Sequence, residues 1–344
     1  MYQIGPAQDP RWNELIMHHP SASVFHTPEW MEALRSTYGF EPMVLTMSPP
    51  NRDLTHGVAV CSVNSWLTGR RQVSLPFSDH CEPLVENQDE LYSLLSEMKQ
   101  AAKGARCKYI ELRSLDFSPT AEANLSESEQ FAFHCLDLRP GLNDLYSALH
   151  KDCVRRKVQR AEREHLAYER GRSESLLNRF YRLQVMTRQR QGVPPQPYSW
   201  FRNLARCMGD KLEVRMVSKD ERPVASILTL RFRDTLVYKY GCSEKQFSNL
   251  GGMQWLFWKA IQEAKEEGLR EFDLGRSSTD NEGLIQFKDR LGASRRTLRY
   301  WRYYPVASPR RGPSRTMALA KMVCAHLPNQ WLTSAGSLLY RHVA

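Results

Sequence analysis

Several features that define common protein classes are missing from this sequence. It has no run close to the ~18–20 uninterrupted apolar residues that a membrane-spanning helix needs. The amino-terminal stretch MYQIGPAQDPRWNEL lacks a basic segment followed by an apolar one, which argues against a secretory signal there. Low-complexity tracts are also missing, and 41% of the residues are hydrophobic. We therefore expect a cytoplasmic protein that is folded over most of its length.

Signatures of metal sites and of covalent catalysis are missing as well. The eight cysteines include no CxxC pair and no Cys/His spacing typical of zinc. The sequence has neither a GxSxG elbow nor a Cys/His nucleophile signature, and it has no recognised DNA- or RNA-binding motif. We expect free thiols in a reducing compartment, no metal, and no sequence-specific binding to DNA.

Charge is the first positive feature. The formal net charge is +10 and the calculated pI is about 9.2. Such a surface concentrates anionic partners, among them nucleotide-linked donors, tRNA, polyanionic glycans and lipid headgroups. The charge alone does not choose among these partners, and a merely basic surface without a specific partner is the alternative.

The length of 344 residues predicts two domains, because single hydrophobic cores stop growing near ~250–300 residues. Helical and strand patterns alternate in both halves, which is typical of α/β proteins. Pro140 and Gly141 form a natural joint. We predict an N-terminal domain over residues 1–140, a C-terminal domain over 141–304, and a basic linker with a helical tail over 305–344.

The same patterns predict individual elements. In the first half we expect helices at Pro28–Tyr38 and Gln88–Lys103, and strands at Met43–Met47, Gly57–Val63, Gln72–Leu75, Cys107–Leu112 and Phe131–Leu138. In the second half we expect helices at Leu142–His165, Ser173–Arg190, Trp200–Met208, Met253–Glu267 and Gly283–Leu291, and strands at Leu212–Ser218, Val224–Arg231, Thr235–Gly241, Glu271–Leu274 and Thr297–Tyr303.

The tail from Thr316 to Ala344 is apolar at helical spacing and is broken by Pro328 and Gly336. One interpretation is a helical pair docked on the body of the protein. The other is a peripheral element at the inner membrane surface, because amphipathic segments beside basic residues can lie in the headgroup layer.

One long segment carries a family resemblance. From Tyr238 to Gly292 the chain has YKYG at a strand end, then a helix closed by Gly268, FDLGR on a strand, and GLIQFK at the start of a helix. FemABX-type transferases and their acetyltransferase-like relatives have these pieces in the same order in their second domain. FHTPEWMEAL and LPFSDHCEPL in the first half also resemble segments of this wider group. The sequence therefore resembles a GNAT-superfamily acyltransferase of the FemABX-like group, some of whose members are associated with exopolysaccharide or cell-envelope gene sets.

This resemblance implies a fold and an activity. The implied fold is a pair of tandem GNAT-like domains, each a mixed, largely antiparallel twisted sheet flanked by helices. The implied activity is N-acyl transfer from acyl-CoA or aminoacyl-tRNA, used as a co-substrate with no permanently bound cofactor. The implied acceptor is an amine of a cell-envelope, peptidoglycan-precursor or exopolysaccharide-related molecule. The chain lacks the long coiled-coil insertion of some members. The alternative is a non-catalytic GNAT-like scaffold in envelope or exopolysaccharide assembly.

Several residues are candidates for binding the donor. The loop SNLGG, with Gly251 and Gly252, precedes a helix and could present backbone N–H groups to phosphate. An ordinary strand-to-helix turn also favours glycine. The resemblance places Lys288 at the donor side of the site, where it would neutralise phosphate or developing negative charge. Arg276 could clamp a carboxylate or phosphate, and Asn281 is grouped with these residues.

Three residues are candidates for the chemistry itself. Asp273 follows Phe272 near the carboxyl end of a strand and could accept the amine proton. A buried structural pair with Arg276 is the alternative. Tyr238 and Tyr240 are expected to share one face of their strand, where a phenol could act as a general acid or simply pack in the core.

Two further segments are candidates for binding an acceptor and a polyanion. Asp79, His80 and Glu82 crowd one loop and either bind the acceptor amine or stabilise the loop. The basic stretch Lys151–Arg163 could bind tRNA. The alternative is a charged helix that only faces solvent, which is the usual state of such a helix.

Overall fold

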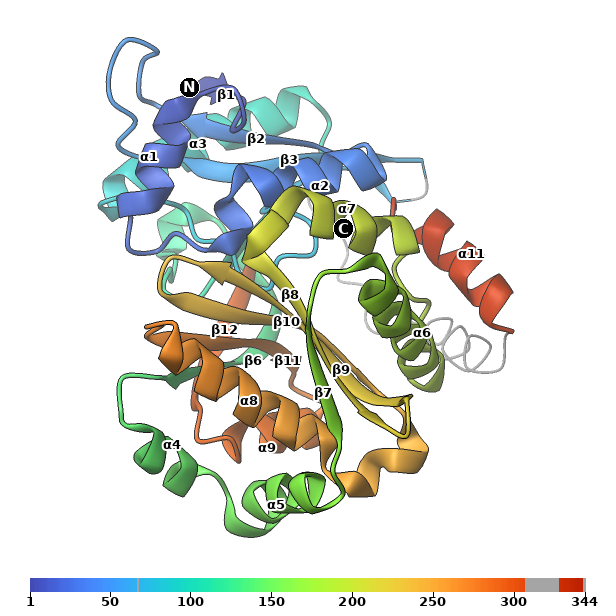
Figure 1. Cartoon of the computed structure of the whole chain (residues 1–344). Coiled ribbons are helices and arrows are strands. Elements are labelled where there is room, and N and C mark those ends of the chain that lie inside the picture. The colour runs from blue at the N-terminus through green and yellow to red at the C-terminus, as the bar shows by residue number, and fades with distance from the viewer. Residues whose placement is uncertain (67, 307–327, 343–344) are drawn as a thin grey trace. The chain divides into compact units, whose positions relative to one another are not determined.

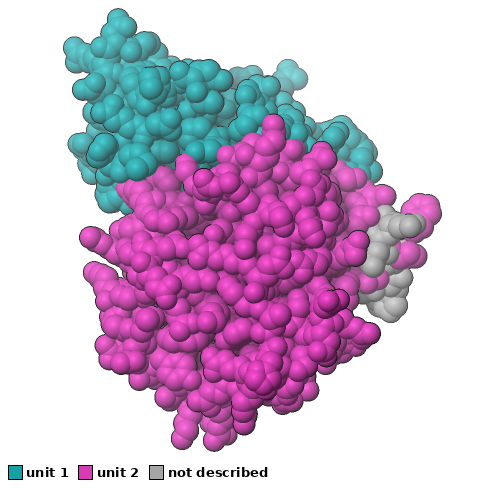
Figure 2. Space-filling model, in the orientation of Figure 1, with its two compact units in different colours: residues 1–131, 297–312, 338–344 teal, residues 132–296, 313–337 magenta. Residues whose placement is uncertain are grey.

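The computed structural model describes residues 1–66, 68–306 and 328–342. The chain divides into two compact units, coloured separately in Figure 2. Unit 1 contains Met1–Phe131, Thr297–Gly312 and Leu338–Ala344, and unit 2 contains Ala132–Arg296 and Pro313–Ser337. The predicted linker and the start of the predicted tail, 307–327, lie outside the described residues.

Unit 1 is built on a sheet in the order β1-β2-β3-β4-β5-β12. The β4–β5 pair is parallel, and the other neighbours with a recorded register pair antiparallel. The strands are β1 Tyr2–Ile4, β2 Glu41–Thr46, β3 Val58–Ser65, β4 Gly69–Val73, β5 Ile110–Ser114 and β12 Ser294–Tyr303. The helices are α1 Pro10–His18, α2 Pro28–Tyr38 and α3 Gln88–Gly104, with short 3-10 turns at Val24–His26 and Ala121–Ala123.

The helices of unit 1 form where their capping residues predict. Thr27 accepts a hydrogen bond from the backbone N–H of Trp30, Pro28 occupies the first helical position, and Gly39 ends α2 with φ +69°. Helix α3 buries Leu94 and Met98 against the sheet. The predicted limits of α2 are confirmed without change.

Unit 2 is built on a sheet in the order β6-β11-β10-β9-β8-β7. The strands from β7 to β10 form an antiparallel meander, and β10 and β11 are parallel, joined through α8. The strands are β6 Ser126–Asp137, β7 Ala167–Gly171, β8 Leu212–Lys219, β9 Arg222–Phe232, β10 Thr235–Ser243 and β11 Glu271–Ser278. The helices are α4 Leu142–Ala148, α5 Arg156–Arg163, α6 Glu174–Arg190, α7 Tyr198–Met208, α8 Gly252–Glu266, α9 Glu282–Asp289 and most of α11 Asn329–Leu339, with 3-10 turns at Gly209–Lys211 and Lys245–Leu250.

Helix α8 covers one face of the unit 2 sheet (Figure 1). Its Leu256, Phe257 and Ile261 are fully buried in a core that includes Phe272 and Leu274 of β11. Burying each such side chain contributes roughly 1.5–3 kcal/mol. The expected fold class, mixed α/β with largely antiparallel sheets flanked by helices, is confirmed.

The predicted single helix over Leu142–His165 is wrong. The chain breaks at Leu149 and His150, and a π-helical turn, Lys151–Arg155, precedes α5. The reason is local: the His150 ring nitrogen Nδ1 accepts hydrogen bonds from the backbone N–H groups of Asp152 and Cys153, so a new helix begins there.

The compact units divide the chain differently from the predicted domains. Strands β6 and β12 each begin in one unit and end in the other, so residues 132–140 belong with unit 2 and residues 297–303 with unit 1. The sequence patterns also gave no indication of β1, α1 or β7, which are short elements. No helix among the described residues is long and apolar enough to cross a bilayer.

Candidate functional site

The parallel strands β10 and β11 pair only over a short stretch. Their register runs from Thr235 opposite Glu271 to Val237 opposite Asp273. Both strands continue, β10 to Ser243 and β11 to Ser278, past the end of this register. The carboxyl ends of adjacent parallel strands are where open α/β folds bind ligands. The predicted candidates Tyr238, Tyr240 and Arg276 lie on these strand ends.

A β-bulge in β10 separates the two tyrosines. Tyr238 pairs with Thr229 of β9, and Tyr240 pairs with the next residue, Leu228, so Lys239 is the extra residue of the bulge. Adjacent residues of β9 point to opposite faces. Tyr238 and Tyr240 therefore lie on opposite faces, and the prediction that they share one face is wrong.

The contacts of the two tyrosines agree with this arrangement. The Tyr238 ring lies edge-on to Phe257 of α8, with 4.9 Å between ring centroids. The Tyr240 ring lies edge-on to Phe201 of α7 at 5.1 Å, and its hydroxyl accepts a hydrogen bond of 2.9 Å from Trp200 Nε1. Tyr238 therefore packs against α8 and Tyr240 against α7, and both side chains are half-buried.

Asp273 and Lys288 meet at a turn in β11. Gly275 has φ +69°, a left-handed conformation that favours glycine. Asp273 Oδ1 accepts the Gly275 N–H at 2.7 Å. Lys288 Nζ donates to the carbonyl oxygens of Gly275 and Arg276 at 3.0 and 3.1 Å. Two charged side chains thus hold one peptide turn.

Lys288 is buried, contrary to the usual state of lysine, with 1% of its surface exposed. Asp273 is 5% exposed, and Arg276 is half-buried. The ammonium of Lys288 therefore acts on its surroundings through the two backbone carbonyl groups.

The candidate phosphate loop is shaped by close packing. Gly251 has φ +81°, and a Cβ on it would lie 2.2 Å from the carbonyl oxygen of Lys157. A Cβ on Gly252 would lie 2.9 Å from side-chain atoms of Val217 and Val224. Both glycines are thus required for the start of α8 to pack against α5 and the β8–β9 hairpin. Asn281 is the N-cap of α9, because its Oδ1 accepts the Leu284 N–H at 3.2 Å.

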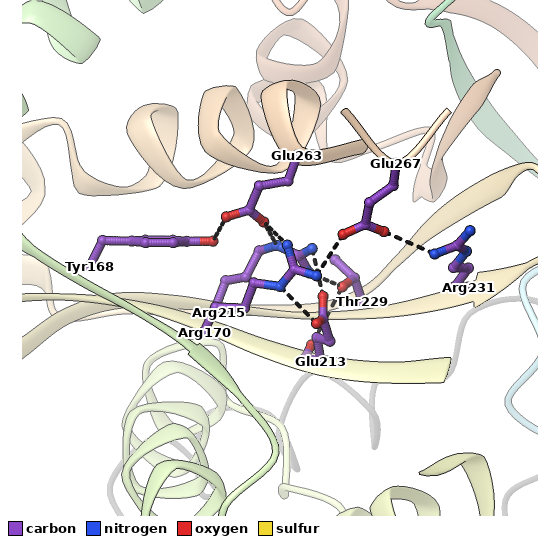
Figure 3. Close-up of polar contacts among 8 residues, drawn as sticks. All are labelled: Tyr168, Arg170, Glu213, Arg215, Thr229, Arg231, Glu263 and Glu267. Atoms are coloured by element: carbon purple, nitrogen blue, oxygen red, sulfur yellow. Dashed lines mark hydrogen bonds and ion pairs between the residues drawn. The ribbon is translucent and has the colours of Figure 1, made fainter. Parts of the chain in front are cut away.

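A buried ion network fixes the other end of α8 to the sheet (Figure 3). Arg215 of β8, 1% exposed, donates to Glu263 of α8 at 2.9 Å, to Glu213 at 2.8 Å, and to the Thr229 hydroxyl. Arg170 of β7 reaches Glu213, Glu263 and Glu267, and the network also includes Tyr168 and Arg231. Burial, followed by the hydrogen bond to Glu263, raises the pKa of Tyr168. The network holds the helix whose start is the candidate phosphate loop.

The predicted acceptor residues lie in unit 1. Glu82 is 6% exposed and accepts hydrogen bonds from the Leu115 N–H and the Ser114 hydroxyl, and burial raises its pKa. The His80 ring packs edge-on against Phe25 at 5.5 Å. The backbone carbonyl of Asp79 accepts a hydrogen bond from the Tyr300 hydroxyl at 2.8 Å. These contacts fix the segment to β5, to β12 and to the Val24–His26 turn of unit 1, and its role in acceptor binding stays a prediction.

Two polar side chains near Lys288 were missed by the sequence analysis. His134 of β6 is fully buried, with Nε2 3.0 Å from Asp289 Oδ1, and its Nδ1 has no hydrogen-bond partner among the described residues. Burial lowers the pKa of His134 against the effect of Asp289. Ser277 of β11 is 2% exposed, and its hydroxyl likewise has no partner in the described part of the chain. Nothing in a single sequence pairs His134 with a residue so distant along the chain.

The cysteines of the described residues are free thiols. Within the same residues, no group of three or more His, Cys, Asp or Glu side chains could hold a metal ion.

One protein family matches the part of the chain that contains β10 and β11. Residues 150–289 match the acetyltransferase (GNAT) domain family. They contain β7 to β11 and α5 to α9, including the β10–β11 pair, the start of α8 and the helix that carries Lys288. No curated protein sequence matches the chain.

Solved structures match nearly the whole chain. FemX is similar with a TM-score of 0.68 at 13% identity, over 88% of this chain and 97% of FemX. The C-terminal domain of a putative lysylphosphatidylglycerol synthetase from Agrobacterium fabrum gives 0.56 at 15% identity, over 86% of this chain and 91% of that domain. A tandem GNAT protein from the clavulanic acid biosynthesis pathway gives 0.55 at 11%, over 89% and 98%.

Residues 150–289 therefore form a GNAT domain, as the sequence resemblance predicted for this half of the chain. The chain has the fold of the FemABX-like group, and FemX is one of the solved structures that it resembles.

Proposed function

We propose that this protein is an N-acyltransferase that moves an acyl or aminoacyl group from acyl-CoA or aminoacyl-tRNA to an amine of a cell-envelope, peptidoglycan-precursor or exopolysaccharide-related acceptor. The observation that carries the proposal is the geometry of β10 and β11 inside the GNAT domain. The strands leave their common register at Val237 and Asp273, beside the turn that Asp273 and Lys288 hold. An extended acyl carrier would enter between these strand ends.

The reaction would proceed by direct attack. The amine nitrogen bonds to the acyl carbon, negative charge develops on the carbonyl oxygen, and the C–S or C–O bond to the carrier breaks. The amine loses a proton to a base and the leaving group gains one. Asp273 is the candidate base, and Tyr240, with its hydroxyl oriented by Trp200, is the candidate acid.

Lys288 would act in this reaction through the turn that it holds. Its ammonium polarises the peptide between Gly275 and Arg276, which strengthens the Arg276 N–H as a donor. A preorganised donor aimed at a developing oxyanion contributes about 10²–10³-fold to the rate. Arg276 would also bind donor phosphate through its guanidinium, and Gly251, Gly252 and Asn281 would line the phosphate site at the starts of α8 and α9.

An envelope acceptor is supported by the names of two similar structures. FemX and the putative lysylphosphatidylglycerol synthetase share this fold. The product in the second name, lysylphosphatidylglycerol, is an aminoacylated phospholipid. An aminoacyl-tRNA donor would find a basic surface on α5, where Arg156 and Arg163 are exposed. Asp79, His80 and Glu82 remain the proposed acceptor residues, with Glu82 acting as a support for the Ser114–Leu115 backbone.

A scaffold without catalysis is the second candidate function. It is favoured by the burial of Lys288 and by the engagement of Asp273 with its own strand, since both groups serve the backbone in this structure. The two functions differ in one measurable respect: only a transferase must bind an activated donor.

The test measures donor binding and turnover on the full-length chain. A donor at 100 times its Kd should raise the unfolding free energy by about 2.7 kcal/mol. Acetyl-CoA, longer acyl-CoAs and charged tRNA form the panel, and turnover is followed as amine-dependent release of free CoA or uncharged tRNA. We expect one donor class to bind and to turn over. No thermal response to any of them, with no turnover, would assign the scaffold function.

A further inference from the structure

Unit 1 presents an unusually exposed tryptophan. Trp66 lies in the turn of the hairpin between β3 and β4, and 85% of its surface is exposed. Tryptophan is highly buried on average, so an exposed one marks a candidate interaction surface. Neither the GNAT domain match nor the proposed chemistry involves this hairpin.

The end of the chain is fixed beside this tryptophan. The His342 ring is T-shaped against Trp66, with 5.6 Å between centroids, and its Nδ1 lies 2.9 Å from the Ser65 hydroxyl. The His342 carbonyl accepts hydrogen bonds from Thr68 and from Arg71 at 3.0 and 2.7 Å. These bonds anchor the residues that follow α11 on the β3–β4 hairpin.

Two exposed leucines come with this anchor. Leu338 is 64% exposed and Leu339 is 38% exposed, and the His342 N–H donates to the Leu339 carbonyl at 2.8 Å. Trp66 and Leu339 thus both lie next to His342, and Leu338 directly precedes Leu339, so these three exposed apolar residues are candidates for one surface patch within unit 1. Such a patch on a protein surface favours contact with a second apolar phase.

The charged residues in the segments that form the patch are basic. The stretches 58–77, 98–110 and 331–344 hold the hairpin, the second half of α3 with the turn before β5, and most of α11 with the residues after it, and they contain no Asp or Glu. On the neighbouring strand β2, Glu41 lies opposite Ser62 of β3. Arg70, Lys108 and Arg341 are exposed. Lys108 belongs to the hairpin region, because its N–H donates to the Arg70 carbonyl at 2.7 Å and its side chain packs over Gly69.

We propose that Trp66, Leu338 and Leu339, with Arg70, Lys108 and Arg341 around them, form a docking surface for a bilayer that contains anionic phospholipid. Tryptophan suits the interface between headgroups and acyl chains because its ring is apolar and its N–H is polar. The leucines insert beside it, and each basic residue near an anionic surface contributes about 1 kcal/mol. A nucleic acid would also be attracted by the charge, but it would leave both leucines against water. This inference is independent of the proposed acyl transfer.

The proposal is tested by cosedimentation of the full-length protein with vesicles. Phosphatidylcholine vesicles are compared with vesicles that also contain phosphatidylglycerol. We expect binding only to the anionic vesicles, weakened by salt. The double variant Leu338→Ser/Leu339→Ser and the single variant Trp66→Ser should each lower the partition coefficient at least tenfold, and Arg70→Gln/Lys108→Gln/Arg341→Gln should lower it about 100-fold.

A charge-matched control distinguishes binding through this surface from a general effect of the protein's net charge. Arg156→Gln/Arg163→Gln/Arg202→Gln removes the same charge from exposed positions in unit 2 and should leave most of the binding. Equal loss in this control, binding of wild type to neutral vesicles alone, or no vesicle binding at all would overturn the proposal. So would apolar variants that bind vesicles like wild type. The same variants are titrated with single-stranded RNA, and a surface that loses RNA binding but not vesicle binding would be a nucleic-acid site instead.

Discussion

Asp273 and Lys288 hold the same residue from its two sides. The carboxylate accepts the Gly275 N–H, and the ammonium donates to the Gly275 carbonyl. The two charges lie on different elements, β11 and α9, so the turn between them is fixed to both. If acyl transfer occurs beside this turn, both side chains contribute by holding the peptide groups in place.

The first prediction concerns these two residues. Lys288→Met removes the donor to two carbonyl groups but keeps the length of the side chain, and we expect transfer to fall about 100-fold. Asp273→Asn keeps the hydrogen bond to Gly275 and removes the base, so we expect the rate to fall with little change in the melting temperature. Rates are measured with the donor identified by the binding panel. Full activity in Lys288→Met would remove this residue from the mechanism.

The second prediction concerns the buried network in Figure 3. Arg215→Leu leaves Glu263 and Glu213 paired with Arg170 alone, so we expect a loss of about 3 kcal/mol, the lower end of the range for breaking a buried pair. Chemical denaturation measures this loss. Arg231→Gln is the control, because Arg231 is 46% exposed and its pair with Glu267 is worth about 1 kcal/mol or less. Equal effects in the two variants would contradict the structural role given to Arg215.

The third prediction concerns the start of α8. Gly251→Ala forces a Cβ against the Lys157 carbonyl in a left-handed conformation, and we expect a loss of about 2–4 kcal/mol. Gly283→Ala in α9 is the matched control. A Cβ there meets nothing within 4 Å, so we expect stabilisation of about 0.5–1 kcal/mol. Thermal denaturation of both variants is sufficient, and a neutral Gly251→Ala would remove the packing explanation of this glycine.

The fourth prediction is a pH dependence that originates at His26. The ring is fully buried, its Nδ1 accepts the Ser23 N–H at 3.0 Å, and its Nε2–H donates to the Glu82 carbonyl at 2.9 Å. These bonds fit the neutral ring, and burial lowers the pKa of His26 from 6.5 to about 4. Below pH 6.5 the unfolded chain takes up a proton that the folded chain does not. The stabilising contribution is therefore present above pH 6.5 and is lost between pH 6.5 and about 4.

The size of this effect is about 3 kcal/mol over that range. It is measured as the difference between wild type and His26→Gln in the free energy of unfolding, at several pH values. Glu82 contributes with the opposite sign, because burial raises its pKa, and His134 contributes with the same sign as His26. Both are present in the two proteins, so their contributions cancel in the difference. A difference that does not change with pH would contradict the assignment.

Local signals predicted the elements with strong caps and regular spacing. Thr27 and Pro28 predicted the start of α2, and the strand patterns of β8 to β10 predicted the meander. The break at His150 was missed because a histidine acting as an N-cap through its ring is not a common start signal. The bulge at Lys239 was missed because YKY alternates normally and the shift is visible only in the pairing with β9.

The candidate site was only partly accessible from sequence. The GLIQFK and FDLGR motifs led to Lys288 and Asp273, and the structure brings both to Gly275. The sequence spacing of Asp273 and Lys288 does not show that both side chains are buried or that both bond to Gly275. These features depend on the packing of α9 against β11. The pairing of His134 with Asp289 depends likewise on contacts across the sheet.

The course of β12 has a consequence for synthesis on the ribosome. This strand completes the pairing of β5 in unit 1, with Arg299 opposite Ser114 and Tyr303 opposite Ile110. It is translated only after the GNAT domain at residues 150–289. Most of unit 1 therefore leaves the ribosome first, but the edge of β5 stays unpaired until residues 150–289 have been made and β12 follows. The unit that is translated first cannot complete its sheet first.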